Sequence, residues 1–324
     1  MRILLDQAEH TLRNKGNNAM LQATVQRLTS VWPEAAFDLI TIAPNLARVY
    51  YPAVAPVDPY TLRPYQGRMD VLHRYLPGAA WQLGFELREE LWQRRPRKTA
   101  GATAELSRLE DVELLDELDF SEDDGQQISS EVSGLSSDLI EAIAQYDLYI
   151  ATGGGYVCDH DKELLLALFD RLDAAISSGV PTVLAGQGVG PMQDPLLLAR
   201  AREVLPRTYL LFYRNERLGR PLLEEVGVPA DKMMMTGDDA VEMAHQSRRA
   251  TLGNGIGISL RVSSYTGVNA GQIDRLRNVL HQAAAEREAQ LISVPISSAA
   301  HESDVKYIKQ LIKGYPDTTV SWKR

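Results

Sequence analysis

Four short polar segments of the sequence contain residue types that bind small anionic molecules. Three of them directly follow a short apolar run: residues 152–155 (TGGG), 186–191 (GQGVGP) and 236–239 (TGDD). The fourth, residues 14–18 (NKGNN), lies beyond the apolar run at the amino terminus. In an open parallel sheet, ligands bind in the crevice at the carboxyl ends of the strands, so we expect these segments to meet at one edge. Glycines there allow close approach to backbone N–H groups that hold anions, and the pattern predicts a site for an anionic small molecule.

The predicted substrate-binding residues are polar residues and glycines of these segments, together with two arginines. They are Asn14, Gly16, Asn17, Asn18, Gly153, Gly154, Gly155, Gln187, Gly188, Gly190, Arg217, Asp238 and Arg261. Three consecutive glycines at 153–155 exceed what a tight turn requires, which favours a cradle for a phosphate or a sugar edge over a turn alone. The Gln187 amide offers both a donor and an acceptor, which suits sugar hydroxyls.

Two residues, Arg214 and Asp159, are predicted to be catalytic. Arg214 follows an apolar run, and a guanidinium matches carboxylate and phosphate oxygens in bidentate fashion. The alternative for Arg214 is an ion pair with Glu216 or a neighbouring acid. Asp159 can orient or deprotonate an acceptor hydroxyl, because base catalysis needs a carboxylate within hydrogen-bond reach. Alternatively, Asp159 or Asp161 caps the helix expected near residue 161, and the sequence leaves both readings open.

No metal or cofactor site is expected. Residues 159–161 (DHD) match a three-letter metal signature that is common by chance. Asp238 and Asp239 give too few oxygens for a hard cation, so one of them is expected to cap the following turn. Residues 186–191 lack the GxGxxG spacing of a dinucleotide site. His10 lies in the first loop, either facing the site or simply solvated.

Composition limits the function classes. The chain has 324 residues, enough for about two domains, and its net charge of −9 argues against non-specific nucleic-acid binding. With one cysteine, no intrachain disulfide forms. The amino terminus reads as a strand without the apolar core of a secretory signal, and no apolar run approaches the ~20 residues of a membrane span. We expect a cytoplasmic protein, with work at the inner face of a membrane left open.

Strands and helices alternate along much of the chain. A strand at 2–5, a helix at 19–31 and a strand at 37–42 are expected first, then a long proline-rich loop over 44–66, a helix over 70–95 and an acidic stretch over 99–135. Helices over 137–145, 161–178, 195–204 and 216–226 then alternate with strands over 147–151, 181–185, 208–213 and 232–236. This pattern predicts an α/β protein with a parallel sheet, whose first Rossmann-like lobe covers 1–245 and carries an irregular insertion at 44–135.

A second Rossmann-like lobe is expected over 255–324, after a linker at 246–254. It would contain strands over 256–261, 290–295 and 318–322 and helices over 270–288 and 302–313. Three strands and two helices would cover a parallel sheet poorly. We therefore expect this lobe to be truncated or degenerate.

In their order and spacing, the motifs resemble the polysaccharide pyruvyl transferase family. The residues that carry the resemblance are 14–19 (NKGNNA), 152–155 with Asp159, 186–191, 213–217 (YRNER), 236–240 (TGDDA) and 258–261 (ISLR). The resemblance covers 1–43 and 136–300. It implies two Rossmann-like lobes in the manner of glycosyltransferase-B enzymes. It also implies transfer of the enolpyruvyl unit of phosphoenolpyruvate to sugar hydroxyls of a cell-surface polysaccharide precursor. Nothing after Arg261 matches the family's Arg-x-His motif.

Three functional hypotheses follow. The first is pyruvyl transfer, with phosphoenolpyruvate as donor substrate, no cofactor, and a glycan or lipid-linked glycan as acceptor. The second is a glycosyltransferase of the same architecture that uses a nucleotide sugar. The third is a non-catalytic relative that binds a carbohydrate or a partner. The acceptor sugar, the linkage and the oligomeric state, a homo-oligomer included, are not fixed by the sequence.

Overall fold

The computed structural model describes residues 1–59, 61–65, 137–251, 253–262, 268, 270–297 and 304–320. The chain divides into two compact units, one made of Met1–Pro64 with Asp138–Arg324 and the other of Tyr65–Ser137. The helix predicted over 70–95 and the acidic stretch over 99–135 lie outside the described residues.

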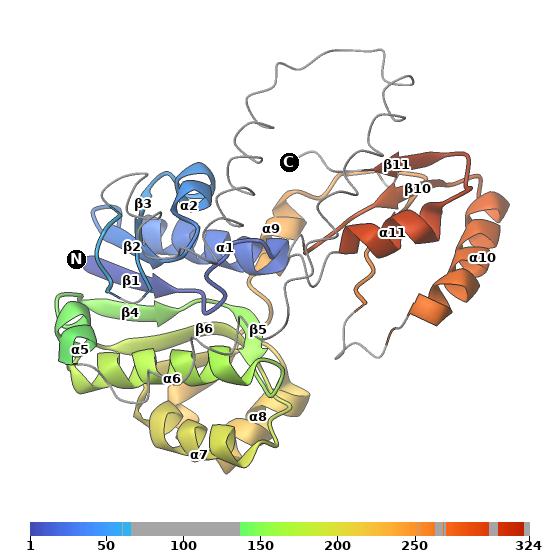
Figure 1. The fold of residues 1–324 in the computed structure, drawn as a ribbon. Coiled ribbons are helices and arrows are strands. Elements are labelled where there is room, and N and C mark those ends of the chain that lie inside the picture. The colour runs from blue at the N-terminus through green and yellow to red at the C-terminus, as the bar shows by residue number, and fades with distance from the viewer. Residues whose placement is uncertain are drawn as a thin grey trace, which may run out of the picture. The chain divides into compact units, whose positions relative to one another are not determined.

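The main sheet of the first unit is parallel and has eight strands (Figure 1). They are β1 (Arg2–Asp6), β2 (Ala36–Ile40), β3 (Val54–Val57), β4 (Leu148–Ala151), β5 (Gly154–Val157), β6 (Thr182–Val189), β7 (Leu210–Tyr213) and β8 (Met233–Met235). Seven of them follow the order β3-β2-β1-β4-β6-β7-β8, and β5 pairs with β6. The chain therefore builds the sheet outward from β1 in one direction and then, from β4, in the other.

Both faces of this sheet are buried, as successive side chains of β1 show. Ile3 and Leu5 pack with residues of α1 (Lys15–Val31) and α2 (Pro44–Tyr50), whereas Leu4 packs on the opposite side. The helices of that opposite side are α5 (Ser137–Ile143), α6 (Lys162–Ser177), α7 (Pro195–Val204) and α8 (Glu216–Glu225) (Figure 1). Apolar residues on both faces are what a parallel sheet covered by helices requires.

Polar side chains start several of these helices. The Asn14 side chain accepts hydrogen bonds from the backbone of Gly16 and Asn17 at the start of α1. Asp161 accepts one from Leu164 at the start of α6, and Asp194 caps α7. Such caps satisfy N–H groups that have no partner within the helix, so they fix where each helix begins beside the sheet.

Shorter elements complete the main sheet. The 3-10 helices η4 (Leu205–Arg207) and η5 (Ala230–Lys232) precede β7 and β8, and α9 (Ala240–Gln246) follows β8 and packs on α1. Among the described residues, no helix is both long enough and apolar enough to cross a membrane.

The second sheet is a smaller parallel sheet of three strands with its own apolar core. It consists of β9 (Gly255–Ile258), β10 (Gln290–Ser293) and β11 (Thr318–Val320), in the order β11-β10-β9. The helices α10 (Ala270–Glu286) and α11 (Asp304–Ile312) contribute Ile273, Ala284 and Ile308 to that core.

The predicted α/β class with parallel sheets is confirmed, and most predicted elements are present within a few residues. The prediction of an irregular loop over 44–66 is wrong for residues 44–57, which form α2 and β3. The glycine segment at 152–155 is not only a turn, because Gly154 and Gly155 belong to β5. The division into lobes at 246–254 stays a prediction.

Candidate functional site

The order of the strands in the main sheet reverses between β1 and β4. The connections leave β1 toward β2 and β3 on one side, and the chain returns to add β4, β6, β7 and β8 on the other. In open α/β sheets, ligands bind outside the carboxyl ends of the strands where the order reverses. Here β1 ends at Asp6 and β4 ends at Ala151, and these two residues are paired in register.

At this carboxyl edge, the Arg214 side chain is held by Asp238. Its Nη1 donates to Asp238 Oδ2 at 2.7 Å and also lies 3.3 Å from the Met20 sulfur. The opposite edge of the guanidinium lies against two glycines: a Cβ on Gly188 would come within 3.0 Å of Nε, and one on Gly155 within 3.3 Å of Nη2. The side chain is 27% exposed. Nε and Nη2, the pair that binds an oxyanion in bidentate fashion, therefore lie over backbone that lacks side chains.

A second acidic residue of the same loop, Asp239, is buried and points back toward the sheet. Its Oδ1 pairs with Arg27 of α1, and Oδ2 is buried without a described partner. A Cβ on Gly186, where φ is +58°, would overlap the Asp239 carboxylate. Arg27 also binds Glu242 of α9 at 2.7 Å, so one guanidinium joins two acids.

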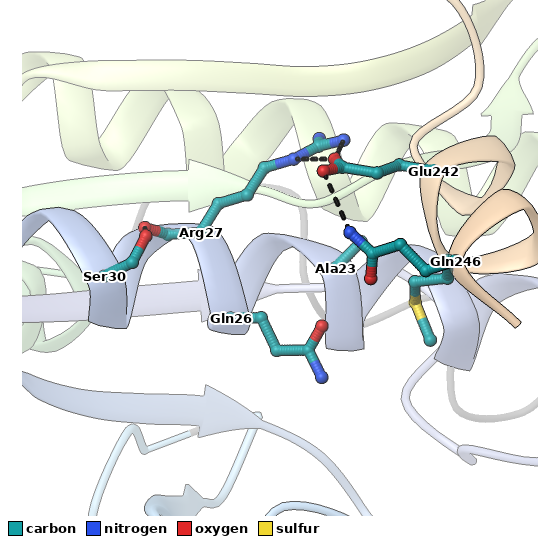
Figure 2. Close-up of a pocket in the computed structure, with 7 residues that line it drawn as sticks. Ala23, Gln26, Arg27, Ser30, Glu242 and Gln246 are labelled. Carbon is teal, nitrogen blue, oxygen red and sulfur yellow. Dashed lines mark hydrogen bonds and ion pairs between the residues drawn. The ribbon is translucent and has the colours of Figure 1, made fainter.

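Figure 2 shows that Arg27 and Glu242 meet across a polar groove between α1 and α9. The groove has a volume of about 190 Å³. Its lining residues are Ala23, Gln26, Arg27, Ser30, Glu242, Met243 and Gln246. None of the predicted site residues lines it. Arg27, which lines the groove, also pairs with Asp239 of the loop before α9.

A cluster of buried polar groups surrounds Asp6 at the end of β1. The Asp6 carboxylate is fully buried and accepts hydrogen bonds from Arg171 Nε of α6 at 2.6 Å, from the Tyr149 hydroxyl, and from the backbone of Ala8 at 2.7 Å. His10 Nε2 lies 3.1 Å from Asp6 Oδ1. A buried carboxylate is costly unless it is paired and hydrogen-bonded, and every one of these partners meets that need.

The charges of this cluster follow from its geometry. Burial raises the pKa of the Asp6 carboxyl, but the Arg171 charge and the His10 hydrogen bond outweigh it and hold that pKa well below its usual range. Burial lowers the pKa of His10 below 6.5, against the hydrogen bond to Asp6, which raises it. Burial likewise raises the pKa of Tyr149 well above its usual range, so its hydroxyl stays protonated. Asp6 is thus ionised at neutral pH, and His10 is neutral.

Three side chains near this cluster contain buried polar atoms without a described hydrogen-bond partner. Gln187 donates from Nε2 to the carbonyls of Ala151 and Thr152, which leaves its Oε1 without a partner. The Thr152 hydroxyl and both polar atoms of the Gln7 amide are also buried and unpartnered. Since buried polar atoms are nearly always hydrogen-bonded, unpartnered atoms gathered at a strand edge point to a place where a ligand or water binds.

The predicted residues of the first loop serve mainly to begin α1. Asn14 caps the helix through Gly16 and Asn17. Asn17 Nδ2 also donates to Glu9 at 3.2 Å, and Asn18 Nδ2 donates to the Leu12 carbonyl at 2.7 Å, while Asn18 Oδ1 is buried without a described partner. This region therefore fixes the loop that carries His10.

The predicted glycines lie where side chains would collide with neighbours. A Cβ on Gly153 would come within 3.0 Å of the Met20 sulfur, and one on Gly154 would overlap the Tyr156 ring. Gly190 has φ of +77°, a conformation that favours glycine. Gly155 and Gly188 lie against the Arg214 guanidinium, so a side chain at either position would approach this predicted site residue.

The remaining predicted residues are more dispersed. Asp159 is exposed and accepts backbone hydrogen bonds from Gln193 at 2.6 Å and Asp194 at 3.2 Å, while Asp161 caps α6. Arg217 is exposed on α8. Arg261 follows β9 of the smaller sheet, and its Nε donates to Asp304 of α11 at 3.2 Å. The structure thus brings Arg214 into contact with Asp238, the Gln187 backbone, Gly155 and Gly188. Asp159, Arg217 and Arg261 are not among the described contacts of Arg214.

Sequence reasoning missed Asp6 and Arg171 and did not select His10 as a site residue. Asp6 and Arg171 are 165 positions apart, and no local pattern joins them. The available signal was a charged residue at the end of an apolar strand, followed four residues later by a histidine. Among the described residues, no group of three or more histidine, cysteine or acidic side chains is arranged to hold a metal ion.

Comparison with known proteins gives one family. A model of the polysaccharide pyruvyl transferase family matches residues 14–309 of this chain. The matched segment begins at Asn14 and includes Arg214 and Arg261. Among curated proteins, no sequence is significantly similar to this one.

Several solved structures are similar in fold. HepE from Anabaena, in complex with UDP and glucose, is 12% identical over 99% of this chain and 69% of its own, with a TM-score of 0.42. MnaA from S. aureus, with UDP, is 10% identical over 98% and 67%, with a TM-score of 0.47. The UDP-GlcNAc 2-epimerase from Neisseria meningitidis, bound to UDP-GlcNAc, is 12% identical over 99% and 72%, with a TM-score of 0.44. Values this low carry no argument about the ligand or reaction of this chain.

Proposed function

Because the chain belongs to the polysaccharide pyruvyl transferase family, we propose that it transfers the pyruvyl group of phosphoenolpyruvate to a sugar hydroxyl. The acceptor is a glycan or lipid-linked glycan precursor of a cell-surface polysaccharide, and the reaction takes place in the cytoplasm or at the inner face of the membrane. Phosphoenolpyruvate is a substrate, and the reaction uses no cofactor.

The observation that best supports this donor is the position of Arg214. Phosphoenolpyruvate has a carboxylate and a phosphate, and each accepts two parallel hydrogen bonds from a guanidinium. Asp238 occupies Nη1 of Arg214 at 2.7 Å, while Nε and Nη2 lie above Gly188 and Gly155. An oxyanion can approach that edge closely because neither glycine has a side chain. Asp238 thereby sets the direction in which the guanidinium presents its bidentate edge.

Sugar hydroxyls need both donors and acceptors. The backbone N–H of Arg214 donates to the backbone carbonyl of Gln187 at 2.9 Å. The side-chain carbonyl of Gln187 and the predicted glycines therefore lie at the same carboxyl edge as Arg214. The acceptor therefore binds on the β1 side of Arg214, toward the point where the strand order reverses. The base role assigned to Asp159 from the sequence stays a prediction.

The direct test is phosphate release. The full chain is incubated with phosphoenolpyruvate and a panel of glycans and lipid-linked glycans, and inorganic phosphate is measured together with the mass of the glycan product. A glycan heavier by one pyruvyl ketal, formed with stoichiometric phosphate, is expected. No release across a broad panel contradicts the proposal.

Thermal shift separates the donor hypotheses without an acceptor. Ligands that bind only the folded state raise the melting temperature, by an amount set by concentration over Kd. We expect phosphoenolpyruvate to raise it in a saturable way and UDP to have no such effect. A saturable shift with UDP and none with phosphoenolpyruvate indicates a nucleotide-sugar transferase. Adding EDTA to chelate metal ions should not change the response to either ligand.

A further inference from the structure

The donor site formed around Arg214 leaves one group of buried titratable residues unused, the pair of Asp6 and His10. We propose that His10, oriented by Asp6, is the residue that takes the proton from the acceptor hydroxyl, and this proposal rests on the proposed pyruvyl transfer. Asp6 is a positioning residue in this arrangement, because it acts on the reaction only through His10.

Hydrogen bonding determines which nitrogen of the ring is basic. An ionised carboxylate only accepts hydrogen bonds, so the contact of 3.1 Å between His10 Nε2 and Asp6 Oδ1 requires a proton on Nε2. The Nδ1 atom then keeps its lone pair. The His10 side chain is 13% exposed while Asp6 is fully buried, so the pair reaches solvent through the histidine.

The residues around the pair hold it in this state. Arg171 of α6 and Tyr149 of β4 both donate hydrogen bonds to Asp6. Arg171 is also the described cation whose charge lowers the pKa of His10. The Thr41 hydroxyl and the Ile42 N–H both donate to the His10 backbone carbonyl, which fixes the loop. Asp6 therefore remains charged, and the ring stays neutral and fixed in orientation.

The location of the pair agrees with its proposed role. Asp6 ends β1 at the reversal of strand order, and Arg214 follows β7, which lies three strands away across β4 and β6. At about 4.8 Å per strand, the two backbones are roughly 14 Å apart along the sheet edge. In the proposed arrangement, phosphoenolpyruvate binds at Arg214 and the sugar hydroxyl approaches His10 along the same carboxyl edge.

The proton balance of the addition closes with this residue. As the hydroxyl oxygen forms its bond to C2 of phosphoenolpyruvate, its O–H bond breaks and the proton passes to Nδ1 of His10. The electron pair of the C2–C3 double bond takes up one proton from solvent at C3, and His10 returns its proton to solvent, so one proton is lost and one is gained. A second hydroxyl then bonds to C2 as its O–H bond breaks. Phosphate leaves C2 with the bonding pair and takes up that proton, which completes the ketal.

Asp159, the base predicted from the sequence, has a different environment. Its two carboxylate oxygens accept the backbone N–H groups of Gln193 and Asp194 just before α7. Those bonds tie the Asp159 carboxylate to the turn before α7. The described hydrogen bond of the His10 ring is at Nε2, whereas both carboxylate oxygens of Asp159 accept described hydrogen bonds.

The test compares His10→Gln and Asp159→Asn with the wild-type chain in the phosphate-release assay from pH 5 to 9. General base catalysis contributes about 10²- to 10⁴-fold, so His10→Gln should lower kcat by at least 100-fold with little change in KM for phosphoenolpyruvate. The wild-type rate should fall at acid pH, as His10 takes a proton below the ordinary histidine pKa of 6.5, and the variant should lose this acid limb. His245→Gln, an exposed histidine of α9, is the matched control and should keep the wild-type rate.

A spectroscopic measurement tests the ring without turnover. The ¹⁵N resonances of His10, assigned by their loss in His10→Gln, should show a neutral ring with the proton on Nε2 at pH 7 and a pKa below 6.5. A proton on Nδ1 would overturn the proposal.

The assay separates the two levels of inference. If the wild-type chain releases phosphate and His10→Gln keeps both its rate and its acid limb, the role of His10 is wrong and pyruvyl transfer stands. If Asp159→Asn instead removes the acid limb, the base is Asp159. If the wild-type chain releases no phosphate with any acceptor, pyruvyl transfer falls and the role of His10 falls with it.

Discussion

Arg214 and Asp238 form an ion pair, with Nη1 2.7 Å from Oδ2, that joins the end of β7 to the loop before α9. Asp238 also accepts the backbone N–H of Ala240 at 2.9 Å through its other oxygen. One carboxylate therefore starts a helix and fixes the orientation of a guanidinium. The arrangement directs the Nε–Nη2 edge of Arg214 toward Gly155 and Gly188, and the proposed donor site depends on this direction as much as on the charge.

Arg214→Lys should weaken donor binding while keeping the positive charge. A lysine ammonium cannot form two parallel hydrogen bonds, and losing one charge-assisted hydrogen bond of about 1.5–3 kcal/mol lowers affinity by roughly an order of magnitude or more. Calorimetric titration of phosphoenolpyruvate into the full chain measures it. Arg220→Lys, a surface residue paired with Glu216 and Glu224, is the control and should bind like wild type. Equal affinities for Arg214→Lys and wild type would remove Arg214 from the site.

Gly188→Ala should displace the Arg214 guanidinium without altering its charge. The added Cβ would lie 3.0 Å from Nε and 3.2 Å from the Gly154 carbonyl, closer than ordinary van der Waals contact. We expect phosphoenolpyruvate affinity to fall several-fold, and Gly155→Ala, whose Cβ would be 3.3 Å from Nη2, to have a smaller effect. Gly253→Ala has no atom within 4 Å of its new Cβ and serves as the control. If Gly188→Ala binds the donor as tightly as Gly253→Ala, the guanidinium does not depend on that surface.

Asp6→Asn should destabilise the fold and change its response to acid. Removing one partner of a buried ion pair leaves Arg171 uncompensated, which costs about 3–5 kcal/mol. The pKa of Asp6 is lowered in the folded state, so its stabilising contribution is present above the unfolded pKa of about 4. That contribution is lost as pH falls toward the folded pKa.

Urea denaturation between pH 2.5 and 7 measures both effects of Asp6→Asn. The variant should have a lower free energy of unfolding at pH 7 and a shallower decline below pH 4 than wild type. Asp274→Asn, an exposed carboxylate paired with Arg277, should differ from wild type by less than about 1 kcal/mol. An Asp6→Asn chain as stable as wild type at pH 7 would contradict the buried ion pair.

Arg27→Ala should cost more stability than its surface position suggests. The Asp239 carboxylate is 8% exposed and has Arg27 as its described partner, so the variant leaves a buried carboxylate without a hydrogen bond. Such a loss costs about 1–3 kcal/mol. Glu242→Gln removes only the exposed ion pair between Arg27 and Glu242, and it should lower the free energy of unfolding by less than about 1 kcal/mol. Thermal unfolding of both variants measures the difference. Equal melting temperatures for Arg27→Ala and Glu242→Gln would show that the Asp239 carboxylate is not stabilised by Arg27.

The regular part of the fold could be predicted from the sequence because the alternation of apolar runs and helical patterns is local. The helix over 195–204 coincides with α7. The region from 44 to 57 was mispredicted because its prolines occupy positions that tolerate them. Pro44 begins α2, where no N–H donor is needed, and Pro56 lies in β3, at the edge of the sheet.

The site could be predicted only in part. Arg214, Asp238 and the glycines share one edge because each follows a strand, and strand ends are visible in the sequence. The Asp6–Arg171 pair depends on how α6 crosses the sheet, and no periodicity records that crossing. Nor does a motif show that the carboxylate of Asp159 is already bound to the backbone of 193–194.

The close approach of Gly186 and Asp239 limits which substitutions related sequences can accept at these two positions. Any side chain at position 186 would occupy the space of the Asp239 carboxylate, and the backbone there has φ of +58°. Substitution at one position should therefore be found only with a compensating change at the other: a larger residue at 186 with a smaller, uncharged one at 239. Because Arg27 neutralises Asp239, the loss of that acid should be accompanied by the loss of the arginine. These three positions, 53 residues apart at the least, should vary as one unit among relatives.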